Sequence, residues 1–471
     1  MCSNMVTTNP SKEYRTVDKE ILKRLQTIFP RDRVSQNEVD LLTYAYDATK
    51  KQYLPQVVVW PETAEEIAAL FKLATETHIP VYPRGAGTGM TGGALALRGG
   101  ILFSLERMNK ILELDEKNRL ITAQAGVVLE TLKQYAQQHG LFYPPDPSSK
   151  KTASLGGTLA ECAGGLNCVK YGTTKDWVQS ARVVLPTGEI VKLGTKARKN
   201  VVGYNFLQLF IGSEGTLGVF SEATLRLIPY PPHRATFIAL FNAVNDSALA
   251  VQRMLESGTT PCALEFIDRV SLEAANSHVQ DRTLPVVDAL LLVEVDGFQQ
   301  DEVGRDSHHL SEICREAGAH EITMADNKEE RESLWDIRRS LSPSMYAKAP
   351  YKTNEDICVP IAEYPHLLKE AYAIAERHNV LTLCFGHAGD GNIHVNFMSH
   401  KEKDPDVEQA VDELFQAVVR LGGSISGEHG IGITKQPFLA YELGEKERSM
   451  IADLKHMFDP AHILNPDKIV L

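Results

Sequence analysis

The chain has 471 residues, of which 43% are hydrophobic and 23% are charged, and its formal net charge is −12. This length exceeds what one hydrophobic core supports, so two or three domains are expected, and the acidic excess excludes nucleic acid as a partner because it repels phosphate. The seven cysteines are scattered and no long apolar run occurs, so we expect a cytoplasmic protein with free thiols, no membrane span and no iron–sulfur cluster. Peripheral attachment to a membrane is left open.

Short strands and a few helices are expected in the first half of the chain. Helical spacing of apolar residues predicts a helix over 17–29, and Thr63 with Glu66 forms a capping box that predicts a second helix to about Thr77. A third helix is predicted over 129–139. Apolar runs predict strands over 56–60, 78–82, 101–105, 120–123, 181–185, 190–193 and 219–227. This mixture is typical of an α+β fold and not of regular βαβ alternation.

The second half alternates helices with strands after a proline-rich break. Residues 229–232 (PYPP) indicate a domain boundary near residue 230. Beyond it, apolar spacing predicts helices over 245–257, 308–317, 362–378 and 406–421. Shorter apolar runs predict strands over 236–241, 290–295, 381–386 and 393–397. Such alternation suits an antiparallel sheet that is covered by helices.

Residues 84–93 form a glycine-dense loop. Glycine permits positive φ angles and lets backbone N–H groups approach a ligand, and successive inward N–H groups bind phosphate oxygens. Thr88 and Thr91 add hydroxyl donors, so the loop predicts a diphosphate site. Its spacing also matches the dinucleotide-binding fingerprint, but further glycines as far as Gly100 interrupt the helix that this fingerprint requires, so a nicotinamide site is disfavoured.

Two further glycine-rich segments follow in the same half of the chain. One is introduced by the proline-rich residues 144–149 and comprises 154–157 and 163–165, and the other is 213–218. Glycine-rich segments at three places in one domain indicate a large ligand that is contacted from several sides.

Four segments resemble a known family, namely PRGAGTGMTGGA (83–94), PPDPSSKKTASLGGTLAECAGG (144–165), KYGTTKDWV (170–178) and GSEGTLGVFSEATLRLIP (212–229). They resemble the FAD-binding domain of the vanillyl-alcohol oxidase superfamily, and the chain from about residue 40 to 471 resembles its glycolate oxidase flavoprotein subunits, D-lactate dehydrogenases and D-2-hydroxyglutarate dehydrogenases. The resemblance implies that FAD is bound by Pro83, Arg84, Gly85, Ala86, Gly87, Thr88, Gly89, Gly92, Pro145, Asp146, Thr152, Gly156, Gly157, Gly164, Tyr171, Gly172, Glu214, Gly218, Val219 and Asn465. Covalent relatives carry a histidine near the glycine loop, and this loop has none, which implies noncovalent FAD.

The resemblance also implies an architecture. It predicts an α+β fold with a two-subdomain FAD-binding domain, then an antiparallel-sheet substrate (cap) domain, and a C-terminal segment that returns to the FAD domain. The expected divisions are an N-terminal helical segment over 1–50, the FAD-binding domain over 51–230, the cap domain with a metal site over 231–440, and the returning segment over 441–471.

The segment CFGHAGDGNIHVNF (384–397) predicts a hairpin whose turn lies at 389–392. On its second strand His394 and Asn396 share one face, while the apolar residues between and beside them take the other. His387 ends the first strand, so the hairpin can bring both imidazoles to one ion.

Downstream, the sequence SGEHG supplies a carboxylate, Glu428, and a third imidazole, His429. Two histidines and one carboxylate form a three-ligand site with open positions that suits Zn²⁺, Mn²⁺ or Fe²⁺. We interpret His387, His394 and Glu428 as the metal ligands and His429 as the general base, because adjacent residues on an extended chain point in opposite directions. The alternative makes His429 a fourth ligand.

A guanidinium is expected for substrate binding because it holds a carboxylate with two hydrogen bonds. The segment LWDIRRSLS (334–342) matches the family segment that does this. The resemblance implies that Arg338 binds the substrate carboxylate, that Ser342 assists, and that Asn396 helps to fix the substrate.

One departure from the family pattern bears on the substrate. Dicarboxylate-specific relatives carry a lysine two residues before the aspartate that matches Asp356, whereas Asn354 stands here and Lys352 is the nearest lysine. This departure favours D-lactate or glycolate, although Lys352 could still reach a second carboxylate.

The implied activity is FAD- and divalent-metal-dependent oxidation of a small D-2-hydroxy acid to the 2-oxo acid, with hydride transfer to flavin N5. A separate acceptor must then receive the electrons: a quinone, a cytochrome, a flavoprotein or an iron–sulfur subunit. The alternatives are a D-2-hydroxyglutarate dehydrogenase, an oxidase that uses O₂ directly, a redox-neutral lipid-synthesising relative, and a subunit that only carries flavin for electron transfer. A homodimer is left open.

Overall fold

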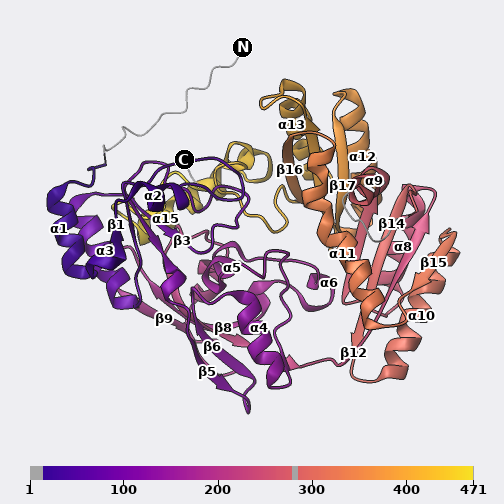
Figure 1. The fold of residues 1–471 in the computed structure, drawn as a ribbon, viewed down its shortest axis with the longest axis horizontal. Coiled ribbons are helices and arrows are strands. Elements are labelled where there is room, and N and C mark those ends of the chain that lie inside the picture. Colours follow the sequence, from indigo (N-terminus) through magenta and orange to yellow (C-terminus); the bar gives the residue numbers. More distant parts are fainter. Residues whose placement is uncertain (1–13, 278–284, 470–471) are drawn as a thin grey trace.

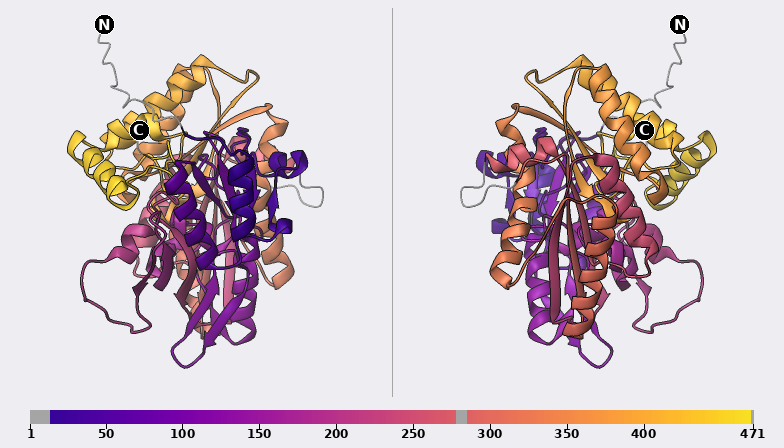
Figure 2. Two further views of the ribbon diagram at one scale, coloured as in Figure 1. Left: turned by 90° about the vertical axis from the view of Figure 1, so that its left-hand side faces the viewer. Right: turned by 90° about the vertical axis from the view of Figure 1, so that its right-hand side faces the viewer.

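The computed structural model describes residues 14–277 and 285–469 and contains two domains that lie side by side (Figure 1). We call the part built on strands β1 to β11 the first domain and the part built on β12 to β18 the second domain. The C-terminal segment crosses back to the first domain (Figures 1 and 2). Its residues Ile463 and Leu464 therefore share a core with Ile21 and Leu25 from the start of the chain.

The first domain contains two main sheets. One has four strands in the order β1-β2-β4-β3, with β2 and β3 parallel to β4, and the other has five antiparallel strands in the order β5-β6-β10-β8-β9. The strands of this domain are β1 Val34–Ser35, β2 Val57–Val59, β3 Val81–Arg84, β4 Ile101–Ser104, β5 Ile111–Asp115, β6 Leu120–Gln124, β7 Leu141–Phe142, β8 Val178–Val184, β9 Ile190–Gly194, β10 Val219–Arg226 and β11 Ile228–Pro229.

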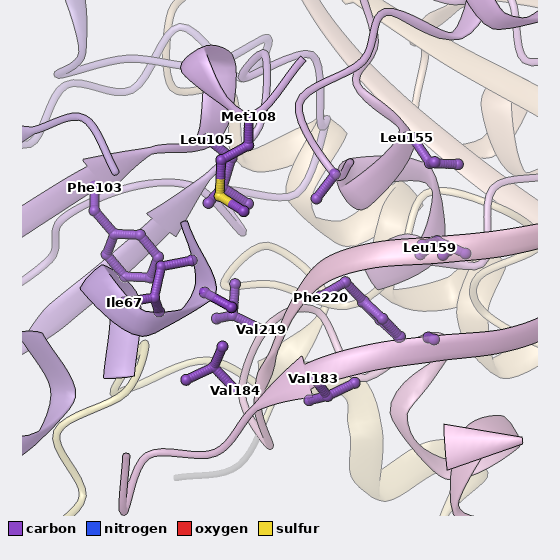
Figure 3. Close-up of a cluster of buried hydrophobic side chains, with 14 of the residues drawn as sticks. Ile67, Phe103, Leu105, Met108, Leu155, Leu159, Val183, Val184, Val219 and Phe220 are labelled. Carbon is purple, nitrogen blue, oxygen red and sulfur yellow. The ribbon is translucent and has the colours of Figure 1, made fainter. Parts of the chain in front are cut away.

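The first half of the chain and the returning segment also contain helices. They are α1 Lys19–Ile28, α2 Glu38–Thr43, α3 Ala64–Thr77, α4 Leu129–Gln138, α5 Leu155–Glu161, α6 Cys168–Tyr171 and α7 Phe206–Phe210, with α14 Leu439–Glu442 and α15 Glu445–Phe458 in the returning segment. Side chains from α3, α5 and both sheets meet in one apolar core that includes Ile67, Phe103, Leu155, Val183 and Val219 (Figure 3). Because Val219 directly follows the glycine-rich residues 213–218, this core also fixes that segment.

Every helix and strand predicted in the first half occurs, and two details differ. The strand predicted over 78–82 forms later, as β3, because His78 adopts a left-handed conformation (φ 53°) that ends α3. The capping box at Thr63 is only half present. The Thr63 hydroxyl accepts from the N–H of Glu66, but the Glu66 carboxylate turns to Arg33 and to the N–H of Glu62.

The second domain is built on one antiparallel sheet of seven strands in the order β15-β12-β14-β13-β17-β18-β16. These strands are β12 His233–Phe241, β13 Ala263–Asp268, β14 Ala289–Gly297, β15 Glu321–Met324, β16 Tyr351–Cys358, β17 Leu381–His387 and β18 Asn392–Ser399. The fold class expected for the chain, including the antiparallel second sheet and the returning C-terminal segment, is confirmed.

Helices cover both faces of the large sheet. One face packs against α8 Val244–Glu256, α10 Gln300–Glu316, α12 Tyr364–Arg377 and α13 Pro405–Arg420, and the other packs against α9 Arg269–Asn276 and α11 Lys328–Ser344. In β18, Ile393, Val395 and Phe397 join the first of these cores, which leaves His394 and Asn396 on the opposite face. The predicted hairpin and its alternation are therefore confirmed. Within the described residues, no helix combines the length and apolarity that a membrane span requires.

The sequence pattern did not predict α5, α11, β13 or β16, all of which reach the site described below. Helix α11 is charged along most of its length, and only a narrow stripe that includes Leu334, Ile337 and Leu341 is buried. Such a stripe gives a weak periodic signal, because tertiary packing rather than sequence propensity stabilises the helix.

The returning C-terminal segment is hydrogen-bonded to the glycine loop. The side-chain amide of Asn465 donates to the carbonyl oxygens of Gly93 (3.1 Å) and Glu214 (2.9 Å). The ammonium group of Lys468 donates to three carbonyl oxygens at the end of the loop, those of Gly92, Gly93 and Leu95. The last residues of the chain therefore fix the loop from behind.

We predict that Asn465→Gly lowers the free energy of unfolding by about 2 kcal/mol, because it leaves the buried carbonyl group of Glu214 without its donor and removes one of the two donors to Gly93. Glycine retains the left-handed backbone of this position (φ 45°), so the change isolates the side chain. Denaturant unfolding of the full chain measures the effect. The control is Asn379→Gly, at an exposed left-handed position, which should change stability by less than about 0.5 kcal/mol. Equal effects of the two changes would contradict the role given to the Asn465 amide.

Candidate active site

A cavity of about 470 Å³ lies between the two domains, within the usual range of ligand-binding clefts. The first domain contributes the glycine loop, α5 and the end of segment 213–218, and the second domain contributes α11, β16, β17, β18 and the segment with Glu428. Of the residues expected to bind FAD, those in its wall are Pro83, Arg84, Gly85, Ala86, Gly87, Thr88, Gly89, Asp146, Gly156, Gly157, Glu214, Gly218 and Val219.

The wall formed by the first domain contains several glycines among polar side chains such as Lys150. At Gly87 (φ 68°) a Cβ atom would collide with the guanidinium of Arg84, which folds beneath the loop. At Gly156 a Cβ atom would lie 2.7 Å from the Cβ of Ala125. At these two positions the atoms packed behind the wall leave no room for a side chain, so only glycine fits and the backbone faces the cavity. Such a wall fits a large ligand with a diphosphate group.

The remaining expected FAD residues lie outside the cavity wall in the described part of the chain: Gly92, Pro145, Thr152, Gly164, Tyr171, Gly172 and Asn465. Several of them support the wall from behind. The hydroxyl of Tyr171 donates to the carboxylate of Asp296 in the second domain, and Gly164 lies against Glu428, where a Cβ atom would be 2.8 Å from Oε2. Thr152 is exposed and bonds locally to Ser149.

Three expected metal ligands come together at the second-domain side of the cavity. The Oε1 atom of Glu428 lies 3.4 Å from Nε2 of His387 and 3.6 Å from Nε2 of His394. One ligand atom of each residue lies within 4.8 Å of the other two. Two imidazole nitrogens and a carboxylate oxygen are a donor set that suits Zn²⁺, Mn²⁺ or Fe²⁺, so these residues fit a divalent ion.

A buried carboxylate orients this group from behind. Glu265 of β13 accepts from Nδ1 of His387 (2.6 Å) and from Nε of Arg338 (2.5 Å). The first bond fixes the imidazole so that Nε2 faces Glu428. Metal-binding histidines are commonly held in this way by a carboxylate that does not itself contact the metal. Burial raises the pKa of a carboxyl group, but the charges of His387 and Arg338 prevail and lower the pKa of Glu265 to about 2.

A second buried carboxylate holds the segment that carries Glu428 and His429. The Oδ2 atom of Asp356 accepts from the backbone N–H groups of Glu428 (2.8 Å) and His429 (2.9 Å). The ring of His429 stacks on that of His394, with centroids 5.3 Å apart. Asp356, His394 and His429 form a further group of ligand atoms within 4.8 Å of one another. His429 thus lies beside the three donors, in the cavity wall.

Of the three residues expected to bind the substrate, two line the cavity and one lies behind its wall. Arg338 and Ser342, one turn apart on α11, line the cavity, and the Ser342 hydroxyl accepts from Nζ of Lys352 (3.1 Å). Asn396 is fully buried and lies outside the wall, and its Oδ1 accepts from the amide of Asn354 (2.6 Å). Lys352 and Asn354, on one face of β16, line the cavity instead.

Sequence reasoning did not select Glu265 or Asp356 as site residues. Glu265 lies within a strand that is buried throughout, ALEFID (263–268), whereas Asp356 lies in the mainly polar strand YKTNEDIC (351–358) and gives no such signal. A charged group inside an otherwise apolar strand is a usable signal, because burial of a charge requires a partner.

We predict that Glu265→Gln lowers the free energy of unfolding by about 3–5 kcal/mol near neutral pH, because it leaves Arg338 buried without its counter-ion. Since the pKa of Glu265 is lowered from 4.5 to about 2, its contribution is complete above pH 4.5 and is lost as the pH falls towards 2. The difference between wild type and variant should shrink over the same interval in denaturant unfolding. Glu273→Gln, which removes a more exposed ion pair with Lys348, should cost less than about 1 kcal/mol. A pH-independent difference would refute this role.

Two family models match this chain, one in each of its two domains. Residues 55–194 match the family described as "FAD binding domain", and residues 230–469 match "FAD linked oxidases, C-terminal domain". The glycolate oxidase subunit GlcD of Bacillus subtilis (strain 168) is 36% identical over 96% of this chain and 97% of its own. The D-lactate dehydrogenase of Anaerostipes hadrus is 36% identical over 97% and 98%. The D-2-hydroxyglutarate dehydrogenase of Xanthomonas citri pv. viticola is 34% identical over 96% and 97%.

Solved structures show the same fold at low sequence identity. An alkyldihydroxyacetonephosphate synthase superposes with a TM-score of 0.77 at 19% identity, over 96% of this chain and 86% of its own. A p-cresol methylhydroxylase superposes with a TM-score of 0.76 at 17% identity, over 94% and 95%. These similarities confirm the resemblance seen in the sequence motifs. The chain therefore belongs to the FAD-linked oxidases and is a flavin-dependent oxidoreductase.

Proposed function

We propose that this protein oxidises a small D-2-hydroxy acid, with D-lactate or glycolate favoured, to the 2-oxo acid, using noncovalent FAD and a divalent metal ion. The observation that carries the proposal is a single cavity lined on one side by the FAD loop and on the other by metal-type donors, a free imidazole and a guanidinium. The named relatives that act on glycolate, D-lactate and D-2-hydroxyglutarate support the substrate class.

His387, His394 and Glu428 would hold the metal ion. A divalent ion at such a site lowers the pKa of a hydroxyl group next to it. Glu265 fixes His387, and the backbone N–H bonds to Asp356 fix Glu428, so the donors are held in place by groups outside the triad. Zn²⁺, Mn²⁺ and Fe²⁺ all suit this set.

His429 is the proposed general base. It lies in the cavity wall, stacked on His394, where it can accept the proton of the substrate hydroxyl. The bond between its backbone N–H and Asp356 sets the position of the ring relative to the three donors. FAD, when bound, supplies the hydride acceptor.

Arg338 is the proposed anchor for the substrate carboxylate. Its Nε donates to Glu265, which leaves the two terminal nitrogens of the guanidinium for a ligand in the cavity that Arg338 lines. Ser342 assists from the same helix, and Asn396 acts through Asn354, to which it is hydrogen-bonded. Binding at several points turns the reacting carbon towards the flavin side of the cavity.

D-2-hydroxyglutarate is the second candidate substrate. Lys352 lines the cavity and its ammonium group reaches Ser342, so it could bind a second carboxylate. Asn354, however, offers an uncharged amide at the position nearer to Asp356, which favours a substrate with one carboxylate.

Electrons would pass to a separate acceptor, a quinone, a cytochrome, a flavoprotein or an iron–sulfur subunit, and the relatives named as subunits support assembly into a complex. A homodimer is the other assembly we consider.

We predict that D-lactate or glycolate bleaches the flavin absorbance under anaerobic conditions, whereas L-lactate does not. D-2-hydroxyglutarate serves as the dicarboxylate comparison. Removal of metal by a chelator should abolish bleaching, and Zn²⁺, Mn²⁺ or Fe²⁺ should restore it. Turnover that survives complete metal removal would instead favour a subunit that only carries flavin, and stoichiometric peroxide release in air would favour an oxidase.

We predict that His429→Asn reduces the rate of flavin reduction by about 10²–10⁴-fold, because the substrate proton loses its acceptor. Stopped-flow absorbance gives this rate, while the FAD and metal contents should equal those of the wild type. His400→Asn, at an exposed histidine outside the cavity wall, is the matched control. Loss of metal in the His429 variant would assign His429 as a ligand, and a normal rate would remove it as the base.

A further inference from the structure

Glu161, the last residue of α5, is a carboxylic acid in the cavity wall that no role above uses. Its Oε2 atom is buried and has no hydrogen-bond partner among residues 14–277 and 285–469. A buried carboxyl group without a partner destabilises a protein, because it loses its hydration and gains nothing in return.

The groups around Glu161 cannot supply the missing partner. Its neighbours across the cavity are glycines: a Cβ atom on Gly93 would lie 3.1 Å from Oε1, and one on Gly430 would collide with Oε2. These glycines leave room for the carboxyl group and for a ligand beside it. They offer no side-chain donor.

The charged groups that face Glu161 are Glu214, Lys468 and Asp47. Glu214 is satisfied by the backbone N–H groups of Ile431 and Gly432, both at 2.7 Å, and it repels a second anion. The ammonium group of Lys468 is bound to the carbonyl oxygens of the glycine loop, so it acts on Glu161 only at a distance. Burial, followed by the charge of Glu214, raises the pKa of Glu161 well above its usual range.

We propose that Glu161 binds FAD, and that its carboxyl group is the hydrogen-bond partner of a hydroxyl or N–H group in the ribityl–isoalloxazine half of the cofactor. The diphosphate half is assigned to the backbone N–H groups of the glycine loop, which leaves the other half of the cofactor for Glu161. Gly430, which meets Glu161, follows His429 in the chain, so Glu161 lies at the end of the cavity where the reacting ring must approach the proposed base. Glu161 is therefore a cofactor-binding residue that is not among the residues expected to bind FAD from the sequence.

This role predicts opposite effects on the apoprotein and on FAD binding. Glu161→Ala removes an unpaired buried acid, so the apoprotein should melt at a higher temperature than the wild type. The same change removes a partner of FAD, so the dissociation constant for FAD should rise by up to about tenfold, the effect expected for one hydrogen bond between neutral groups. Glu161→Gln, which keeps one carbonyl oxygen, should lie between the two proteins in FAD affinity.

The experiment is thermal melting of the full-length apoprotein, followed by titration with FAD under observation of flavin fluorescence. The matched control is Glu130→Gln, a carboxylate on α4 that bonds to Gln134 and lies outside the cavity wall, which should leave both quantities unchanged. An unchanged FAD affinity in Glu161→Ala would overturn the proposal. A lower melting temperature together with weaker binding would also overturn it, because Glu161 would then be a structural residue.

The inference rests on FAD binding by this family and does not require the proposed substrate. If the wild-type protein binds FAD but does not oxidise any 2-hydroxy acid, the proposed function is wrong. The proposed contact between Glu161 and FAD is not affected by that result.

Discussion

The site depends on the attachment of the segment 428–432 to the wall of the FAD pocket. Glu214, from the first domain, accepts the backbone N–H groups of Ile431 and Gly432, and the hydroxyl of Thr91 in the glycine loop donates to the carbonyl oxygen of His429. These bonds join a flavin-binding wall to the segment that carries Glu428. They hold the donors of the proposed metal site against the wall of the FAD pocket.

Buried carboxylates determine the electrostatics around the proposed metal site. Glu265 and Asp356 are both fully buried, and each is satisfied by several partners rather than by one ion pair. A buried charge is costly when isolated, so each carboxylate requires the cations and N–H groups that surround it to stay in place. The consequence is a rigid outer layer that orients His387, Arg338 and the backbone before any ligand binds, as pre-organised binding sites require.

The wall of the cavity on the FAD side is built differently. It combines glycine backbone with polar side chains such as Lys150, and Oε2 of Glu161 has no hydrogen-bond partner among the described residues. A wall of this kind gives up some stability in the empty protein and regains it when a large polar ligand fills the cavity.

The sequence by itself determined those features that depend on residues close together in the chain. The glycine loop, the hairpin with His387 and His394, and the inward face of β18 follow from glycine content, turn residues and alternation, all of which are local. Only the tertiary structure decided which distant groups meet these segments. Glu265 reaches His387 across 122 positions, and Glu214 reaches Gly432 across 218. It also decided that Asn396 lies behind Asn354 and that Glu161 is left unpaired, because hydrogen bonds between segments far apart in the chain leave no periodic signal in either segment.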